Sequence, residues 1–190
     1  ADYQNYVSNG GQLDLASWRR ANVNALISTV YSAVKEVGEN IKFGISTSAD
    51  ISRNMNSIYA DVITWGSQNG YVDYLCPQIY FGFDHPKLPF KETLISWQDL
   101  VTNENVDLYT GLAVYKCGAE DVNAGSESVT NDNARYEWVN NSDIISRQIK
   151  YCRENEKNSG IAFFSYSYLF SSSPSPVLSQ EVVSAAALLK

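Results

Sequence analysis

The chain alternates between two hydrophobic patterns. From residue 15 to residue 37, apolar side chains recur every three or four positions, which predicts an amphipathic helix that begins after Asp14 and ends at Gly38. Residues 41–47 change to a period of two, which is typical of a strand. The exchange repeats to the end of the chain, with helices predicted at 56–70, 89–102, 142–157 and 179–190 and strands at 72–81, 106–115 and 160–169.

Four strands that alternate with helices predict an α/β fold with a parallel sheet. No linker or change of composition divides residues 1–190, so we expect a single domain. The segment 116–141 follows the third strand and is too long for a plain connection. Loops of this length are usually functional or disordered.

The first three strands each divide into an apolar face and a second face. In the second strand, Leu75 and Ile79 alternate with a set that the sequence places on the opposite side, namely Cys76, Gln78 and Tyr80. This second face is small near the strand starts and polar or aromatic near the strand ends, as in a barrel interior whose rim forms a site. A doubly wound sheet would be apolar on both faces.

We therefore predict a parallel-strand (β/α) repeat that forms half of a TIM-type (β/α)8 barrel, in preference to a doubly wound sheet. The strand count is a difficulty, because a full barrel has eight strands and this sequence predicts four. Four strands alone would leave two open edges and an uncovered inner face. The fourth strand also resists division, since Phe163 lies on one side and Phe164, Tyr166 and Tyr168 on the other.

Charge and hydropathy exclude several classes of partner. The net charge is −7, with 14 Lys and Arg against 21 Asp and Glu and no basic run, which argues against nucleic acid or an anionic membrane surface. No run of about 18 or more apolar residues occurs, and no charged segment precedes an apolar one at the start. We expect neither a membrane span nor a signal peptide within this chain.

The sequence also predicts no metal and no cofactor. Its three cysteines, Cys76, Cys117 and Cys152, are widely spaced and odd in number, which argues against a zinc cluster and a structural disulfide. The single histidine, His85, stands beside a proline, and we interpret it as an exposed loop residue. The glycine-rich motifs that bind nucleotides do not occur.

The candidate binding residues are polar and aromatic groups at strand ends. With 13 Tyr and 4 Trp, the chain is rich in side chains that join a flat apolar face to a polar tip, a composition common in proteins that handle sugars. Gln78 suits a hydroxyl-rich ligand, although a buried glutamine bonded to backbone is an equal alternative. Arg53 and Asn54 could bind a ligand or hold their loop. The residues that could stack on sugar faces are Tyr80, Phe81, Phe83, Tyr115, Trp138, Tyr166 and Tyr168.

No catalytic pair of acids can be identified from spacing. Glycoside hydrolysis normally needs two carboxyl groups about 5–10 Å apart. The acids that follow the predicted strands all lie in loops, and we interpret them as solvated loop acids; they are Asp50, Asp84, Glu120 and Asp121. The catalytic residues are therefore unknown.

Six stretches, in this order, resemble the glycosyl-hydrolase-like family ten of bacterial envelope and secreted proteins. They are WRRANVN (18–24), KFGIS (42–46), VDYLCPQIYF (72–81), LYTGLAVYK (108–116), DIISRQIKYCR (143–153) and GIAFFSYSYL (160–169). The resemblance implies a (β/α)8 barrel, of which this chain would hold strands five to eight. It also implies a glycosidase that acts on bacterial cell-wall glycan and is secreted or held in the cell envelope. The substrate contacts that it implies are Gln78, Tyr80, Arg53, Asn54 and Tyr115.

One motif of that family has no counterpart in this chain. The family carries an acidic segment at the end of strand four, and the sequence begins just beyond it. The general acid or nucleophile is thus expected outside the sequence, and the chain alone is expected to be inactive. We expect an oligosaccharide or polysaccharide partner, together with a missing N-terminal half-barrel or a second copy of the chain. The alternatives are a non-catalytic carbohydrate-binding or interaction module, or a half-barrel that forms a homodimer.

Overall fold

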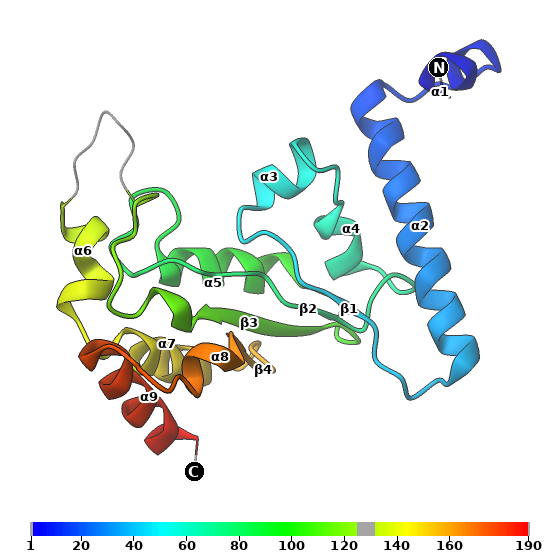
Figure 1. Ribbon diagram of the computed structural model, residues 1–190. Helices are drawn as coiled ribbons and strands as arrows, with labels where there is room; N and C mark the ends of the chain where they lie inside the picture. The colour runs from blue at the N-terminus through cyan, green and yellow to red at the C-terminus, as the bar shows by residue number, and fades with distance from the viewer. Residues whose placement is uncertain (1, 125–131, 190) are drawn as a thin grey trace.

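The computed structural model describes residues 2–124 and 132–189, and it is an α/β structure around one parallel sheet (Figure 1). The prediction of an α/β fold with four parallel strands is confirmed. The strands are β1 (Gly44–Ile45), β2 (Tyr74–Leu75), β3 (Asp107–Ala113) and β4 (Gly160–Phe164). The helices are α1 (Asp2–Ser8), α2 (Leu15–Val37), α3 (Ile51–Asn56), α4 (Val62–Ser67), α5 (Phe90–Leu100), α6 (Asp132–Asn140), α7 (Ile144–Arg153), α8 (Tyr166–Leu169) and α9 (Pro176–Leu188), with a 3-10 turn, η1, at Val114–Lys116.

The strands lie in the order β1-β2-β3-β4, so each strand pairs with the next one along the chain. Pairing continues past the short strand β2, because the Gln78 amide donates to the Thr47 carbonyl at 3.0 Å and the Gly111 amide to the Pro77 carbonyl at 3.0 Å. Parallel neighbours need a crossover, and helices of the chain supply each one. The carboxyl ends of all four strands therefore meet at one edge, which we call the rim.

A single core covers one face of the sheet. Leu75, Ile79, Leu108 and Leu112 are almost fully buried and belong to one cluster with side chains from α4, α5, α7 and α9. Leu75 and Ile79 are the residues that the period-two pattern assigns to the apolar face of the second strand, so that assignment is confirmed. Since these helices all contribute to the same core, the structure lacks the second covered face of a doubly wound sheet within the described ranges.

Tryptophans attach the helices to this core. Trp65 of α4 and Trp97 of α5 are both at most 2% exposed. The Trp97 indole donates from Nε1 to the Ala49 carbonyl at 2.8 Å, and the Trp65 indole donates to Asn24 Oδ1 at 2.7 Å. Burial of a large ring together with a satisfied N–H fixes each helix against the segment that follows β1 or against α2.

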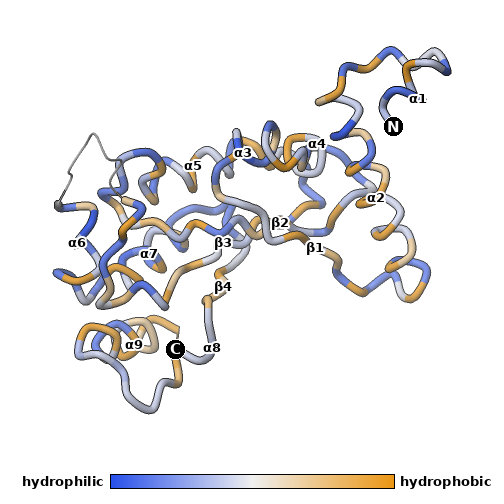
Figure 2. Tube along the Cα trace, turned by 45° about the horizontal axis from the view of Figure 1, so that its top comes forward, coloured by the Kyte–Doolittle hydropathy of each residue, from blue (hydrophilic) through white to orange (hydrophobic). Residues whose placement is uncertain are grey.

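Helix α2 forms where the pattern predicts it, but its apolar stripe is only partly covered. Asp14 Oδ1 accepts from the Ser17 amide at 2.7 Å and caps its start, and Gly38 ends it. None of its side chains is buried, and Leu26 is 61% exposed. In Figure 1 the helix stands away from the sheet, and Figure 2 shows hydrophobic positions recurring along it. Val23 and Ile27 pack against the core cluster, so the stripe is covered in part, while Leu26 and Val30 stay exposed.

The predicted bounds of two elements are wrong. The helix predicted at 56–70 is limited to α4, because Tyr59 has a positive φ of 57° and Asp61 caps a new helix by accepting from the Thr64 amide at 3.2 Å. The unpredicted α3 precedes it. The strand predicted at 160–169 ends at Phe164, and the chain turns into α8, since Ser165 accepts from the Tyr168 amide at 3.1 Å.

The long segment 116–141 contains the unpredicted helix α6. Residues 125–131 of this segment, which the sequence assigned to a long loop, lie outside the described residues. Across the described ranges, no helix is both long and apolar enough to cross a membrane.

Asp73 connects the starts of β1 and β2 to α2. Its carboxylate accepts from Lys35 Nζ at 2.7 Å and from the Phe43 amide at 2.7 Å. Burial opposes ionisation of this carboxyl group, but the hydrogen bonds from Lys35 and Phe43 outweigh it and lower the pKa of Asp73. The ionised form therefore stabilises the fold.

Replacement of Asp73 by Asn should lower the free energy of unfolding by about 1–3 kcal/mol at pH 7, because it removes a charge-assisted pair. A lowered pKa means that this contribution is present above the unfolded value of about 3.9 and is lost as the pH falls through the folded-state value. Urea unfolding of both proteins between pH 7 and pH 2 measures the difference. It should shrink in acid, and a difference that does not change with pH would contradict the assignment. The exposed Asp99, changed to Asn, is the control and should alter stability by less than about 0.5 kcal/mol.

Candidate functional site

The sheet face opposite the core is hollow. A cavity of about 620 Å³ lies over this open face and is lined from all four strand segments. Its lining alternates in sequence with the core residues, as the pleat requires. Members of the lining include Gly44, Ser46, Tyr74, Cys76, Tyr80, Tyr109, Gly111 and Phe164.

Two glycines give room for tyrosine rings on this face. A Cβ on Gly44 would lie 2.3 Å from the ring of Tyr74, and a Cβ on Gly111 would lie 3.2 Å from the ring of Tyr80. Each ring therefore lies across the neighbouring strand and not straight out from the sheet. The small residues that the sequence shows on the second face are the floor on which these rings rest.

Four aromatic side chains gather at the rim, and we call them the aromatic cluster: Tyr80, Tyr115, Phe164 and Tyr168. The rings of Tyr80 and Phe164 are stacked, with centroids 5.7 Å apart and an interplanar angle of 25°. Tyr115 meets both rings edge-on at 6.0 Å and lies 6.2 Å from Tyr168. Phe164 is 53% exposed and Tyr168 is 42% exposed, so the cluster presents apolar ring surface to solvent.

Two tyrosines of the cluster, Tyr80 and Tyr115, keep their protons. Burial raises the pKa of Tyr80, and the nearby Cys76 and Tyr115 raise it further. Burial likewise raises the pKa of Tyr115. Each hydroxyl can therefore donate and accept a hydrogen bond at neutral pH, beside a flat apolar face. Sugars present the same combination of apolar ring face and hydroxyl groups.

Gln78 lies at the same edge of the sheet. Its backbone pairs with the strands on both sides, through bridges to Ser48 and Gly111. Its side chain is exposed, and Nε2 donates to Ser46 Oγ at 3.1 Å. The alternative of a buried glutamine bonded to backbone is therefore wrong.

Arg53 and Asn54 lie on α3, beyond the end of β1. Asn54 is fully buried, and its Nδ2 donates to the Ser48 carbonyl at 2.7 Å, which holds α3 to the end of the strand. Its Oδ1 has no hydrogen-bond partner in the described part of the chain. Arg53 has an exposed side chain. Neither residue belongs to the aromatic cluster.

Other aromatic candidates lie elsewhere. Tyr166 is 75% exposed on α8 and packs on Phe170, with centroids 4.6 Å apart, so it lies outside the aromatic cluster. Trp138 is 1% exposed and cannot offer a stacking surface. Phe164, which the sequence did not indicate as a stacking residue, contacts both Tyr80 and Tyr115 in the aromatic cluster. Its position opposite Tyr80 depends on the register of β3 with β4, which the sequence pattern does not reveal.

The loop acids are mostly engaged with the chain. Asp121 is 4% exposed and accepts from Lys116 Nζ at 2.6 Å, so its interpretation as a solvated acid is wrong. Asp50 caps α3 by accepting from the Arg53 amide at 2.9 Å. Glu120 is exposed and pairs with Arg135 at 2.8 Å. Asp84 is exposed, in agreement with the sequence.

His85 is buried, and its interpretation as an exposed loop residue is also wrong. It is 6% exposed, and its Nδ1 accepts from the Leu88 amide at 3.0 Å. Burial lowers the pKa of His85, which keeps the ring neutral and Nδ1 free to accept. The residue therefore organises the loop between β2 and α5.

Glu137 on α6 is a buried acid that the sequence did not indicate. Its carboxylate accepts from the amides of Phe83 and Asp84 at 2.8 and 3.0 Å. A Cβ on Gly82 would lie 1.9 Å from Oε2, so the approach requires glycine. Burial raises the pKa of Glu137, although both amide bonds oppose the shift. This residue holds the loop that leaves the rim after β2, and only the glycine between two phenylalanines hinted at a close approach.

No group of three or more metal-ligating side chains occurs within residues 2–124 and 132–189. The three cysteines are buried and unpaired. Burial raises the pKa of the Cys76 and Cys152 thiols, so both are unreactive at neutral pH.

Known proteins resemble this chain over most of its length. The family described as Glycosyl hydrolase-like 10 matches residues 1–127. Glycosyl hydrolase YngK of Bacillus subtilis (strain 168) is 29% identical over 181 residues, which cover 87% of this chain and 32% of the relative. Glycosyl hydrolase DigH of Escherichia coli (strain K12) is 32% identical over 133 residues, which cover 62% of this chain and 30% of the relative. The chain thus spans about a third of the length of these curated relatives. No solved structure matches it significantly.

Replacement of Glu137 by Ala should lower the free energy of unfolding by about 1–3 kcal/mol, because it leaves two partly buried amides without their acceptor. Amide hydrogen exchange at Phe83 and Asp84 should accelerate more than exchange in β3. Urea unfolding and hydrogen exchange measure both effects. The control is Glu120→Ala at an exposed ion pair, which should cost less than about 1 kcal/mol. Equal losses in the two variants would show that Glu137 does not hold this loop.

Proposed function

This chain belongs to the glycosyl hydrolase-like 10 family, and from that membership we propose that it is half of the catalytic domain of a glycoside hydrolase. Supporting this, the chain spans about a third of the length of relatives that are named glycosyl hydrolases. The activity of the whole protein, its substrate and its partners are part of the proposal.

The half in question is the C-terminal one, with β1 to β4 as strands five to eight of a TIM-type (β/α)8 barrel and residues 1–190 as one partial domain. The sequential strand order and the covering of one face by helices support this arrangement. The other four strands would pair with the open edges of β1 and β4 and close the open face. The exposed apolar side chains of α2, Leu26 and Val30, are a further surface that they would cover.

The aromatic cluster is the observation that carries the proposed function. Tyr80 and Tyr115 would flank a sugar ring at the rim, and Gln78 would bond its hydroxyls. Arg53, with its exposed side chain, would add a donor from α3, and the buried Asn54 would orient the helix that presents it. Tyr166 would contact a sugar further from the rim. Exposed rings beside protonated hydroxyls support this division of roles.

The catalytic carboxyl groups would come from the other half of the barrel. Glycoside hydrolysis needs an acid that protonates the leaving oxygen and a second carboxylate about 5–10 Å away. Asp50, Glu120 and Asp121 are engaged in a helix cap or an ion pair, which leaves them poorly suited to either role. An upstream acid would protonate the glycosidic oxygen while this half holds the sugar.

We propose a polysaccharide as substrate, with bacterial cell-wall glycan as the first choice, and a secreted or cell-envelope location. The family resemblance supports the glycan. The net charge of −7 favours a neutral polymer at the rim over nucleic acid.

A non-catalytic carbohydrate-binding module is the second candidate, because the aromatic cluster is exposed in this chain by itself. Calorimetry with cell-wall oligosaccharides separates the two functions, since the module should bind them without further sequence. A third arrangement pairs two copies of the chain to close one barrel. Light scattering tests it, and a monomer would exclude that arrangement.

Replacement of Tyr80 by Ala should lower kcat/KM for glycan hydrolysis about 10- to 100-fold in the protein that carries this chain together with its proposed upstream half. The reason is the loss of a stacking face and a hydroxyl, worth about 1–3 kcal/mol in the transition state. The control is Tyr136→Ala on α6, away from the aromatic cluster, which should retain activity. Reducing-sugar release measures both rates. Equal activity in the two variants would remove Tyr80 from the site.

A further inference from the structure

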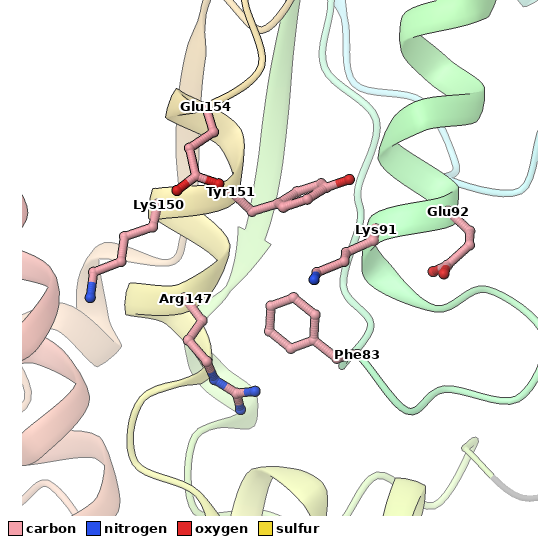
Figure 3. Close-up of a pocket in the computed structure, with 7 residues that line it drawn as sticks. All are labelled: Phe83, Lys91, Glu92, Arg147, Lys150, Tyr151 and Glu154. Atoms are coloured by element: carbon pink, nitrogen blue, oxygen red, sulfur yellow. The ribbon is translucent and has the colours of Figure 1, made fainter.

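A second cavity lies on the outer, helical side of the sheet. It is a groove of about 440 Å³ between α5 and α7, with Phe83 at its floor (Figure 3). Both walls are neighbouring helices of this chain, so the groove is complete without the other half of the barrel. We call it the cationic groove because Lys91, Arg147 and Lys150 line it.

Two of these cations are placed on aromatic rings. Lys91 Nζ lies 5.1 Å from the ring centroid of Tyr151 and 5.9 Å from that of Phe83. Arg147 Cζ lies 4.7 Å from the centroid of Phe83. Figure 3 shows Lys91 reaching from α5 between the two rings and Arg147 reaching from α7 toward Phe83. The rings thus hold both positive charges at the floor of the groove.

These charges are only partly neutralised. Lys91 has no hydrogen bond or ion pair to any residue that the structure describes. Arg147 donates from Nε to Asp143 Oδ1 at 3.1 Å, but both side chains are 42% or more exposed, so the pair is weak. Glu92 and Glu154 also line the groove, so its three cations face these two acids and Asp143 beside Arg147, and Lys91 is a cation without an ion pair among the described residues.

The position of the cations adds to the positive potential. Lys91 is the second residue of α5, and Arg147 is the fourth residue of α7. A cation near a helix N-terminus is unfavourable by a few tenths of a kcal/mol or more, because the helix dipole is positive there. Glu181 accepts from the Ile144 amide, so the first amides of α7 are occupied and an anion would bind the side chains.

We propose that the cationic groove is a second carbohydrate site, distinct from the rim, that binds a sugar carrying a carboxylate. Lys91 and Arg147 would bind the carboxylate, and Tyr151 would supply ring surface and a hydroxyl to the sugar. The presence of Glu92 and Glu154 favours a singly charged group over a phosphate dianion. The volume suits one or two sugar rings. The sugar part of this inference rests on the proposed function, whereas the anion part does not.

Calorimetry on the full chain tests the groove with three probes: trigalacturonate, the neutral cellotriose and inorganic phosphate. Trigalacturonate should bind, and Lys91→Met should weaken its binding at least tenfold while retaining the apolar stem. The matched control, Lys87→Met, replaces an exposed lysine outside the groove and should leave the affinity unchanged. The affinity for trigalacturonate should also fall as salt is raised from 50 to 300 mM.

The outcomes separate this proposal from the proposed function. Loss of trigalacturonate binding in Lys91→Met but not in Tyr80→Ala supports the groove, even if the protein hydrolyses no glycan. Absence of trigalacturonate binding, or equal affinity in the Lys91 and Lys87 variants, overturns it. Phosphate that binds as tightly as trigalacturonate, or cellotriose that depends equally on Lys91, overturns the assignment to an acidic sugar.

Discussion

Burial of one face of the sheet is the constraint on which the rest of the structure depends. Leu75, Ile79, Leu108 and Leu112 pack beneath the helices, and each of them commits its neighbours in sequence to the opposite side. Because alternate residues of a strand point to opposite faces, the glycines, the serine and the tyrosines between the core residues lie on the open face. Because parallel strands end at a common edge, the same constraint brings the aromatic residues that follow the strands to one rim.

Buried carboxylates then fix the segments that the core does not reach. Glu137 binds two amides of the loop after β2, and Glu181 on α9 binds the amides of Ile144 and Ile145 at the start of α7. Burial raises the pKa of both acids, although the amide bonds oppose the shift. Burial of each carboxylate is unfavourable, but its hydrogen bonds to two amides offset that cost, since an amide without an acceptor would also be unfavourable. The loop and the helix that border the cationic groove are both held in this way.

The two candidate sites differ in the physical basis of recognition. The aromatic cluster offers ring faces and protonated hydroxyls, which suit a neutral sugar, and it faces the side that further strands would enclose. The cationic groove offers charge held on rings and lies on the helical side, where its walls are complete. Family membership supports the carbohydrate, while the separation of the two surfaces comes from the fold.

The sequence by itself determined which side of each strand is apolar, where α2 begins and ends, and that Gln78 and Tyr80 share a face. These features follow from local periodicity and from caps such as Asp14, which act over a few residues. Only the tertiary structure decided that Phe164 stacks on Tyr80, that Tyr166 leaves the cluster, and that Glu137 and His85 are buried. The contacts of Phe164 with Tyr80 and of Glu137 with Phe83 join residues more than 50 positions apart, and no local pattern encodes them. Periodicity fixes the face of a strand, but the packing of one strand against the next fixes which side chains meet.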